Sequence, residues 1–310
     1  MIKIVFMGSP EFSVPALNTL SNHQAIEVEL VISQEDKKRG RNRLMPTPVK
    51  QAALDLGLKT YEPKNVNEDY LYERLDHIDP DFIVVIAYGQ LIGDRLLSRF
   101  KDKIINIHSS LLPKYRGAAP MQAAIMAGDE KTGVCSMLIE KSMDTGDVLA
   151  CKEIEINKNT TINQIHDSLS NFAAKLIVET LLNYKELYEK RQKQDESRAS
   201  YSKKIAKEDG HIDFNSTASH IDKQIRAYSS WPSSYAYLND VMVKIHKINI
   251  IDKYTNNEIG NIIEANHNGI FVNCADKCIV ITEVQFPNKK RMSVKSYLMG
   301  NEIPENGKFL

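Results

Sequence analysis

Asn106 and His108 stand two residues apart at the start of NIHSSLLPKYRGAAP, a run that extends to Pro120. If this run leaves the end of a strand, both side chains point to the same side of it. An asparagine amide donates hydrogen bonds without carrying charge, and a histidine exchanges a proton near neutral pH. The pair predicts an oxyanion donor beside an acid or base. An isolated N-x-H is more often a turn cap next to a core histidine. The neighbouring residues therefore decide whether this pair is functional or structural.

The residues that follow the pair have the character of a ligand-binding loop. Ser110 leaves the predicted strand, and Leu111, Leu112 and Pro113 form a rigid apolar wall. The GAAP sequence at 117–120 then adds little side-chain bulk before a helix. Glycine and alanine let backbone groups come close to a flat heterocycle. We therefore expect this loop to bind a planar ligand.

Asp144 is the third residue with a candidate role, and it stands in a D-T-G tripeptide. Aspartic proteases use that tripeptide, but they need two carboxylates that share a proton. This chain has one D-T-G, in a segment of alternating strands and helices rather than an all-β one. A carboxylate beside a histidine favours the charged imidazole. Next to His108, Asp144 would orient that side chain, whereas without His108 it would indicate only a turn.

The elements that position these residues follow from the alternation of apolar runs with helical patterns. This order is typical of βαβ units, and continuous Ile/Val runs indicate strands that are buried on both faces. The first half is therefore predicted to be an α/β domain with a Rossmann-like, mostly parallel sheet. The expected strands are 2–7, 28–33, 82–86 and 103–107, and the expected helices are 10–20, 49–56, 90–100 and an amphipathic helix from Ile162 to Leu181.

The second half predicts a smaller domain of a different kind. A polar segment at 185–205 reads as a connector, followed by a helix near 213–228 and about five short β-like runs. Such a series predicts an OB-like β-barrel. We therefore expect a catalytic domain at 1–184, a linker at 185–205 and a C-terminal domain at 206–310.

Composition excludes several classes of protein. Forty basic and forty acidic residues cancel, so a nucleic acid or membrane would have to meet a local patch. The four cysteines contain no C-x-x-C pair, which argues against a structural metal. No apolar run is long enough for a signal peptide or a membrane span. The dinucleotide pattern G-x-G-x-x-G is absent around Gly8. We expect a cytoplasmic protein without a metal, a bound NAD or a membrane partner.

Several motifs in order give the chain a family resemblance. MGSPEFSVPAL, RLMPTPVK, VVIAYGQLI, SLLPKYRGAAP, SMDTGDVL and AYSSWPSSY together closely resemble the formyltransferases that use 10-formyltetrahydrofolate. The resemblance spans nearly the full length. It implies that Asn106, His108 and Asp144 are catalytic. It also implies folate contacts from two segments: Ser110, Leu111, Leu112 and Pro113 in the loop, and Ile86, Tyr88 and Gly89, mainly through backbone, at an earlier strand end.

The same resemblance suggests the acceptor of the formyl group. The chain is most similar to family members that act on methionyl-tRNA, which implies initiator methionyl-tRNA as partner, a tRNA-binding C-terminal domain and, we expect, a monomer. A basic run would hold the tRNA phosphates, with Arg41 its best match to the family; it comprises Lys37, Lys38, Arg39, Arg41 and Arg43. A solvated loop is the default interpretation of such a run.

Other acceptors and other activities stay open at this point. Formyltransferases that act on glycinamide ribonucleotide or an amino sugar nucleotide share the folate domain, as does a formyl-folate hydrolase. A folate- or RNA-binding module without activity is a further alternative. The intact set of Asn106, His108 and Asp144 argues against that last interpretation.

Overall fold

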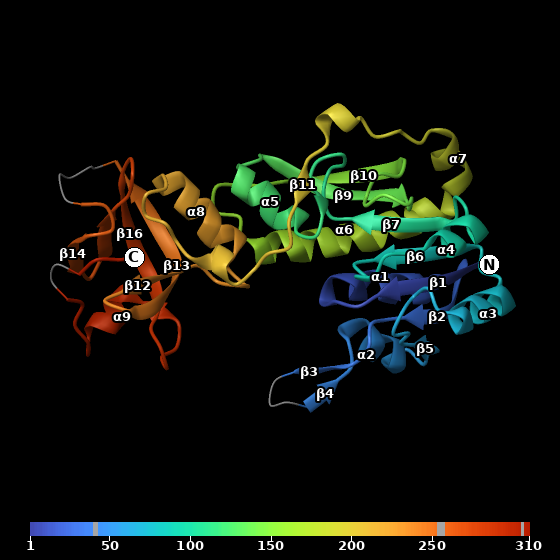
Figure 1. Cartoon of the computed structure of the whole chain (residues 1–310), viewed down its shortest axis with the longest axis horizontal. Helices are drawn as coiled ribbons and strands as arrows, with labels where there is room; N and C mark the ends of the chain where they lie inside the picture. Colours follow the sequence, from blue (N-terminus) through green and yellow to red (C-terminus); the bar gives the residue numbers. More distant parts are fainter. Residues whose placement is uncertain (40–42, 253–257, 305–306) are drawn as a thin grey trace. The chain divides into compact units, whose positions relative to one another are not determined.

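The computed structural model describes residues 1–39, 43–252, 258–304 and 307–310 (Figure 1). The chain divides into two compact units. Unit 1 comprises Met1–Pro120, Lys131–Glu155 and His166–Ser202. Unit 2 comprises Met121–Glu130, Ile156–Ile165 and Lys203–Leu310. Each unit is described by itself below.

Unit 1 is built on one seven-stranded sheet in the order β10-β9-β7-β6-β1-β2-β5. The pairs from β7 to β5 are parallel, whereas β9 is antiparallel to β7 and β10 is antiparallel to β9. The mostly parallel, Rossmann-like sheet is therefore confirmed, and the antiparallel pair is an addition to the prediction. The strands are β1 (Ile2–Gly8), β2 (Ile26–Ile32), β5 (Thr60–Tyr61), β6 (Phe82–Ile86), β7 (Ile104–His108), β9 (Lys131–Leu138) and β10 (Val148–Glu155).

Both faces of this sheet are covered. Along β1, Val5 and Met7 belong to a cluster with Leu71 and other buried residues of the helical layer, while the alternate residue Phe6 is equally buried on the opposite face. Period-two alternation puts those residues on opposite faces, so each face has its own core. The helices are α1 (Val14–Ser21), α2 (Pro48–Asp55), α3 (Asp69–Ile78), α4 (Asp94–Arg99), α7 (Tyr184–Glu189) and, from His166 onward, α6 (Ile162–Leu182).

Local sequence explains where the helices begin. Thr47 accepts a hydrogen bond from the backbone N–H of Lys50, and a proline stands in the first turn of α2, as is typical of a helix start. Pro10 precedes a 3₁₀ turn (η1, Glu11–Ser13), so α1 begins at Val14, later than predicted. Within unit 1, Ser170 of α6 donates to the carbonyl of Phe12 at 2.7 Å. That bond ties the long helix to this turn.

The segment predicted as a connector carries structure of its own. It contains a 3₁₀ turn (η2, Glu196–Arg198) and a short strand β11 (Tyr201–Ser202). Strand β11 pairs in parallel with β8 (Arg116–Gly117), which follows the candidate ligand loop. Residues up to Ser202 thus belong to unit 1, next to the segment that contains His108.

A disulfide joins the two antiparallel strands of unit 1. Cys135 in β9 and Cys151 in β10 are directly opposite each other in the register and are bonded through their sulfur atoms. The sequence analysis did not predict this pair because no cysteine spacing marks two strands as neighbours. Cys274 and Cys278 in unit 2 are free and buried.

Unit 2 contains an antiparallel, curled half-barrel, which confirms the predicted OB-like class. Its sheet has the order β12-β13-β16-β15-β14, with β17 paired to β16. Ile221 and Ile225 on one face of α8 join the core with Val243 and Ile281 of the sheet. The elements are α5 (Pro120–Ala127), η3 (Glu208–Gly210), α8 (Ala218–Ala227), β12 (Tyr235–Leu238), β13 (Val241–Ile251), β14 (Ile262–Asn266), β15 (Gly269–Asn273), β16 (Cys278–Gln285), β17 (Met292–Ser293) and α9 (Val294–Leu298).

Candidate active site

The candidate site begins at the carboxyl end of β7, where the predicted pair stands. Asn106 is opposite Val85 of β6 on one side and Met137 of β9 on the other, and His108 is opposite Cys135. The chain crosses from β2 and β5 on one side of β1 to β6 and β7 on the other, so the strand order reverses at β1. In open α/β sheets ligands bind at the carboxyl ends of strands near such a reversal. The two side chains therefore lie at a favourable edge of the sheet.

His108 is a buried side chain between two oxygen acceptors. Its Nδ1 lies 3.6 Å from Oδ2 of Asp144, and its Nε2 lies 3.0 Å from the carbonyl oxygen of Tyr115. The side chains of His108 and Asp144 are 7% and 18% exposed, so water screens the pair only weakly. A neutral imidazole has one N–H donor, whereas the imidazolium has two and can serve both oxygens. The structure thus brings His108 and Asp144 together as predicted.

Asp144 is held in an uncommon backbone conformation. Its φ is 55°, in the left-handed region, which aspartate tolerates better than most residues. Its Oδ2 accepts a hydrogen bond of 2.8 Å from the backbone N–H of Gly117. One carboxylate oxygen therefore contacts both the histidine and the strand β8 that follows the loop.

Asn106 differs from its neighbours in having an uncommitted side chain. It is partly exposed, and among the described residues no hydrogen-bond partner of its amide is found. The amide can therefore donate to a bound molecule without first breaking a bond within the protein. This is the property that an oxyanion donor needs.

The loop after β7 is closed by its own side chains. Ser110 is buried and donates through its hydroxyl to the carbonyl of Lys114 at 2.6 Å, which closes a turn. Leu111, Leu112 and Pro113 remain partly exposed, as an apolar wall for a ligand requires. A Cβ at Gly133 would lie 2.5 Å from Leu111, so the glycine of β9 makes room for this leucine.

The second predicted folate segment follows β6. Ile86 and Tyr88 have buried side chains, and burial raises the pKa of the Tyr88 phenol. Their carbonyl oxygens accept from Ser13 and Gln34, at 2.7 Å and 3.0 Å. Between and after them, Ala87 and Gly89 are exposed with φ of 48° and 87°. Any contact from this segment would therefore come from exposed backbone rather than from the side chains of Ile86 and Tyr88.

Three residues of the surroundings escaped the sequence analysis. Arg116 is fully buried, and its guanidinium contacts Gln194 and Glu196 of the segment predicted as a connector. Gln194 in turn donates to the carbonyl of Asp144 at 2.8 Å. The arginine of the YRG motif could have indicated such a contact, because an arginine within an apolar loop needs a buried partner. Nothing in the polar segment marked which residue that partner is.

The two units match two parts of one enzyme family. Residues 2–181 match the family described as formyl transferase, and residues 204–302 match the formyl transferase C-terminal domain. The chain belongs to the formyl transferase family. This result confirms the resemblance on which the residue assignments depend.

Individual relatives are similar in sequence to this formyl transferase over nearly its whole length. A methionyl-tRNA formyltransferase of Finegoldia magna is 45% identical, with 98% of each chain covered. One from a Sulfurihydrogenibium species is 40% identical and covers 99% of this chain and 100% of its own. Among solved structures, an N-formyltransferase of Helicobacter canadensis in complex with folinic acid and dTDP-3-aminofucose has a TM-score of 0.64. It is 20% identical, covers 91% of this chain and 99% of its own, and shares the fold.

The basic run of the formyl transferase forms part of a hairpin. Strand β3 (Lys37–Arg39) pairs antiparallel with β4 (Arg43–Met45), and Lys37 and Lys38 are exposed. Lys37 also donates to the side chain of Gln34 at 3.3 Å. Arg41, the best match to the family, lies outside the described residues. For Arg39 and Arg43 only the backbone pairing is described.

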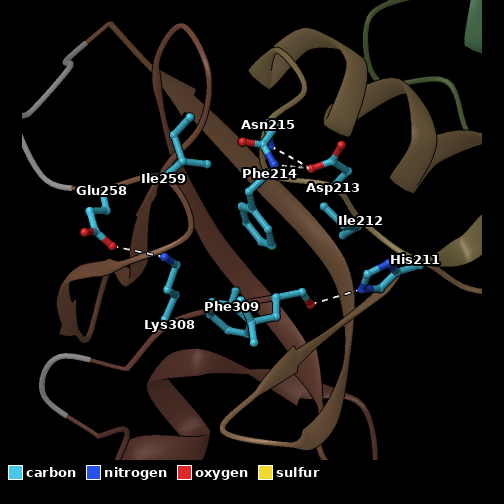
Figure 2. A pocket seen from close by; sticks show the side chains of 10 residues that line it. His211, Ile212, Asp213, Phe214, Asn215, Glu258, Ile259, Lys308 and Phe309 are labelled. Atoms are coloured by element: carbon cyan, nitrogen blue, oxygen red, sulfur yellow. Dashed lines mark hydrogen bonds and ion pairs between the residues drawn. The ribbon is translucent and has the colours of Figure 1, made fainter.

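A cavity of about 810 Å³ lies in unit 2 of this formyl transferase (Figure 2). Phe214 and Phe309 stack inside it, and an ion pair of Lys308 and Glu258 at 3.0 Å stands at its edge. Its described lining residues include none of the predicted catalytic or folate residues and neither Lys37 nor Lys38. Within the described ranges, no group of three or more His, Cys, Asp or Glu side chains is arranged to hold a metal ion. No helix there is long and apolar enough to cross a membrane.

Proposed function

We propose that this formyl transferase moves the formyl group of 10-formyltetrahydrofolate to the α-amino group of initiator methionyl-tRNA. The product is N-formylmethionyl-tRNA for translation initiation. The observation that carries the proposal is the match over both units to relatives named methionyl-tRNA formyltransferase, at 45% and 40% identity. Asn106 and His108 at the end of β7, together with Asp144, whose carboxylate faces His108, support this chemistry.

The reaction exchanges one C–N bond for another. The neutral amino nitrogen attacks the formyl carbon, and a tetrahedral intermediate forms with negative charge on oxygen. The bond between that carbon and N10 of the folate then breaks. The amino group loses one proton and N10 gains one, so atoms and electrons balance without a further reactant.

Each residue of the site is assigned a role in this reaction. Asn106 donates its free amide to the developing oxyanion, because that amide has no partner among the described residues to give up. His108 stabilises the same charge as an imidazolium and passes a proton toward N10. Asp144 faces Nδ1 of the histidine at 3.6 Å and fixes the ring. The fixed surroundings favour the transition state because they need not reorganise during the reaction.

Two segments are proposed to hold the folate. The partly exposed Leu111, Leu112 and Pro113 offer an apolar wall, and exposed backbone at Ala87 and Gly89 offers donors and acceptors to a planar ring. Ser110 supports the wall by closing its turn. The loop after β7 would thus contact the folate through apolar side chains, and the segment after β6 would contact it through backbone groups.

The tRNA is proposed to bind a local basic patch, because a chain with no net charge has no overall positive field to attract it. The exposed Lys37 and Lys38 of the β3–β4 hairpin are the described candidates, and the C-terminal domain at 206–310 is the second. The catalytic domain is assigned to 1–184, and the protein is proposed to act as a monomer in the cytoplasm. In a reducing compartment Cys135 and Cys151 would be thiols.

One experiment tests the acceptor directly. The purified protein is incubated with 10-formyltetrahydrofolate and, in parallel, with charged initiator tRNA, free methionine, glycinamide ribonucleotide or an amino sugar nucleotide. We expect formylation of the charged tRNA and none of the small molecules. Formylation confined to a small molecule would overturn the tRNA assignment and leave the chemistry intact.

A further inference from the structure

A buried arginine near the site has every one of its donors paired. Arg116 is fully buried, and its five N–H groups meet acceptors on three residues. Nε and Nη2 donate to Oε1 of Gln194 at 3.1 Å and 3.0 Å. Both terminal nitrogens donate to Glu196, at 2.7 Å and 2.9 Å, and Nη1 also donates to the hydroxyl of Tyr201 at 3.3 Å. A buried charge persists only with such pairing.

All the hydrogen-bonding groups of the Gln194 side chain are also paired, on one side with Arg116 and on the other with the loop that carries Asp144. Its Oε1 accepts the two bonds from Arg116, and its Nε2 donates to the carbonyls of Asp144 and Gly146, each at 2.8 Å. These four bonds use the whole capacity of a primary amide. The side chain is therefore fixed in one orientation, between the arginine and the loop that carries Asp144.

The contacts close a ring around the catalytic carboxylate. The side chain of Arg116 holds Gln194, Gln194 holds the carbonyl of Asp144, and the next residue after the arginine, Gly117, donates its N–H to the Asp144 carboxylate at 2.8 Å. Asp144 needs such restraint because its φ of 55° is in a sparsely populated region. The same carboxylate oxygen faces His108.

We infer that Gln194 is a positioning residue for formyl transfer, which holds the Asp144 peptide in its left-handed conformation so that the carboxylate faces His108. It acts through Asp144 and does not touch the substrate. The polar segment at 185–205 then has a second task beyond connecting domains, because it completes the support of the catalytic loop. This inference rests on the proposed function.

The substitution Gln194→Glu removes the hydrogen bonds that the side chain donates and keeps those that it accepts. The carboxylate keeps both acceptor contacts to Arg116 and adds an ion pair, but it has no N–H to offer to Asp144 and Gly146. We expect kcat to fall about tenfold to a hundredfold, because small misplacements of catalytic groups cost this much. The KM for 10-formyltetrahydrofolate should stay within about twofold, since no group that binds the folate is removed. Gln192→Glu is the matched control, as that exposed side chain lies in the same segment.

A second readout does not depend on activity. Hydrogen exchange at the Gly117 amide reports whether its bond to Asp144 persists, and Gln194→Glu should speed that exchange at least about tenfold while Gln192→Glu leaves it unchanged. Gln194→Asn, which is one methylene too short to span both partners, should give the same pair of changes if the glutamate variant folds poorly.

The outcomes are distinct. A folded Gln194 variant with kcat near the wild-type value would overturn the inference, as would a loss of kcat with unchanged exchange at Gly117. If the wild-type protein transfers no formyl group to any acceptor, the proposed function fails instead. The exchange measurement then still decides whether Gln194 holds the Asp144 loop.

Discussion

At the scale of single residues, the site depends on one carboxylate that makes two contacts. Oδ2 of Asp144 accepts from the Gly117 backbone and faces Nδ1 of His108. The first contact needs only an acceptor oxygen, whereas orientation of a cationic imidazole needs negative charge. The two requirements can be separated by a change that keeps the shape of the side chain.

Asp144→Asn makes this separation. An amide oxygen can still accept from Gly117, so the urea midpoint of unfolding should stay close to that of the wild type. The variant loses the charge beside His108, and kcat should fall by about 10²–10⁴ because the acid/base group is no longer supported. Asp147→Asn is the control on the same loop; Asp147 pairs with the partly exposed Arg191. Activity of Asp144→Asn close to that of the control would contradict the assigned role.

Residues of the site differed in how far sequence could predict them. The two-residue spacing of Asn106 and His108 predicted only that both side chains point to one side of a strand end; their assignment to the site, like that of Asp144, depended on the loop that follows and on the family pattern. Gln194 could not be found this way, because its role comes from a buried contact to Arg116 far along the chain. In sequence it stands among lysines and glutamates that are exposed. A polar residue shows its importance only when its burial is known.

At the scale of elements, the short pairing of β8 with β11 anchors the end of the candidate ligand loop. Gly117 in β8 has a φ of 113°, and a Cβ there would lie 2.5 Å from the carbonyl oxygen of Ser202. Both the backbone angle and the close approach therefore require glycine at this position. The same residue donates to Asp144, so the pairing and the site are coupled.

Gly117→Ala should lower the free energy of unfolding by about 2–5 kcal/mol, from the left-handed backbone and the clash together. Urea denaturation measures this change, and kcat should fall as well. Gly57→Ala separates the two causes, because Gly57 also has a positive φ of 70° but nothing lies within 4 Å of its added Cβ. The control should cost only about 1–2 kcal/mol. Equal losses in both variants would show that the approach of Ser202 is unimportant.

In unit 2, a histidine at an irregularity of β13 is expected to make the stability of the sheet depend on pH. The register shifts between Ile245 and Lys247, and burial, together with the charge of Arg291, lowers the pKa of His246. The folded state therefore prefers the neutral ring. The contribution of His246 to stability is therefore fully present above the ordinary histidine pKa and is lost as pH falls below it, because the unfolded chain then binds more protons.

His246→Gln should reduce this acid sensitivity. The unfolding midpoint of the wild type should drop between about pH 7 and about pH 5, and the drop should be smaller in the variant because one titrating group is gone. His267→Gln, at an exposed position, makes the same chemical change without the burial. An identical drop in wild type and His246→Gln would rule out this histidine as the source.

The elements themselves were only partly predictable. The parallel strands followed from continuous Ile/Val runs such as that of β6, because burial on both faces selects such residues. The two-residue β5 and the antiparallel pair β9 and β10 were not predicted. The residues of β10 mostly alternate between partly buried and exposed at the edge of the sheet, so the apolar signal of this strand is weak. Short pairs such as β8 with β11 carry too few residues for any pattern.

At the scale of the whole molecule, charge is balanced and binding of a polyanion has to be local. Forty acidic residues offset forty basic ones, so the lysines of the β3–β4 hairpin act against a neutral background. Each lysine that neutralises a phosphate releases condensed counterions, which makes binding salt-dependent. Removal of such a lysine therefore changes the salt dependence as well as the affinity.

The double variant Lys37→Ala/Lys38→Ala tests this local patch. The KM for methionyl-tRNA should rise with little change in the KM for the folate. A plot of the logarithm of the tRNA association constant against the logarithm of the salt concentration should become less steep, by about 0.7–0.9 for each phosphate that is no longer neutralised. Lys101→Ala/Lys103→Ala removes as much charge at exposed positions before β7, at the opposite edge of the sheet. Equal effects of the two double variants would point to general charge rather than to the hairpin.

The most direct test of the central claim is a single-turnover measurement with both substrates saturating. The rate of formyl transfer to methionyl-tRNA is compared between the wild type and Asn106→Ala, and folate binding is measured on the same samples. The free amide of Asn106 is assigned to the oxyanion, so the rate should fall by about 10²–10³ while folate affinity is retained. A rate near that of the wild type in the folded, folate-binding variant would contradict the account.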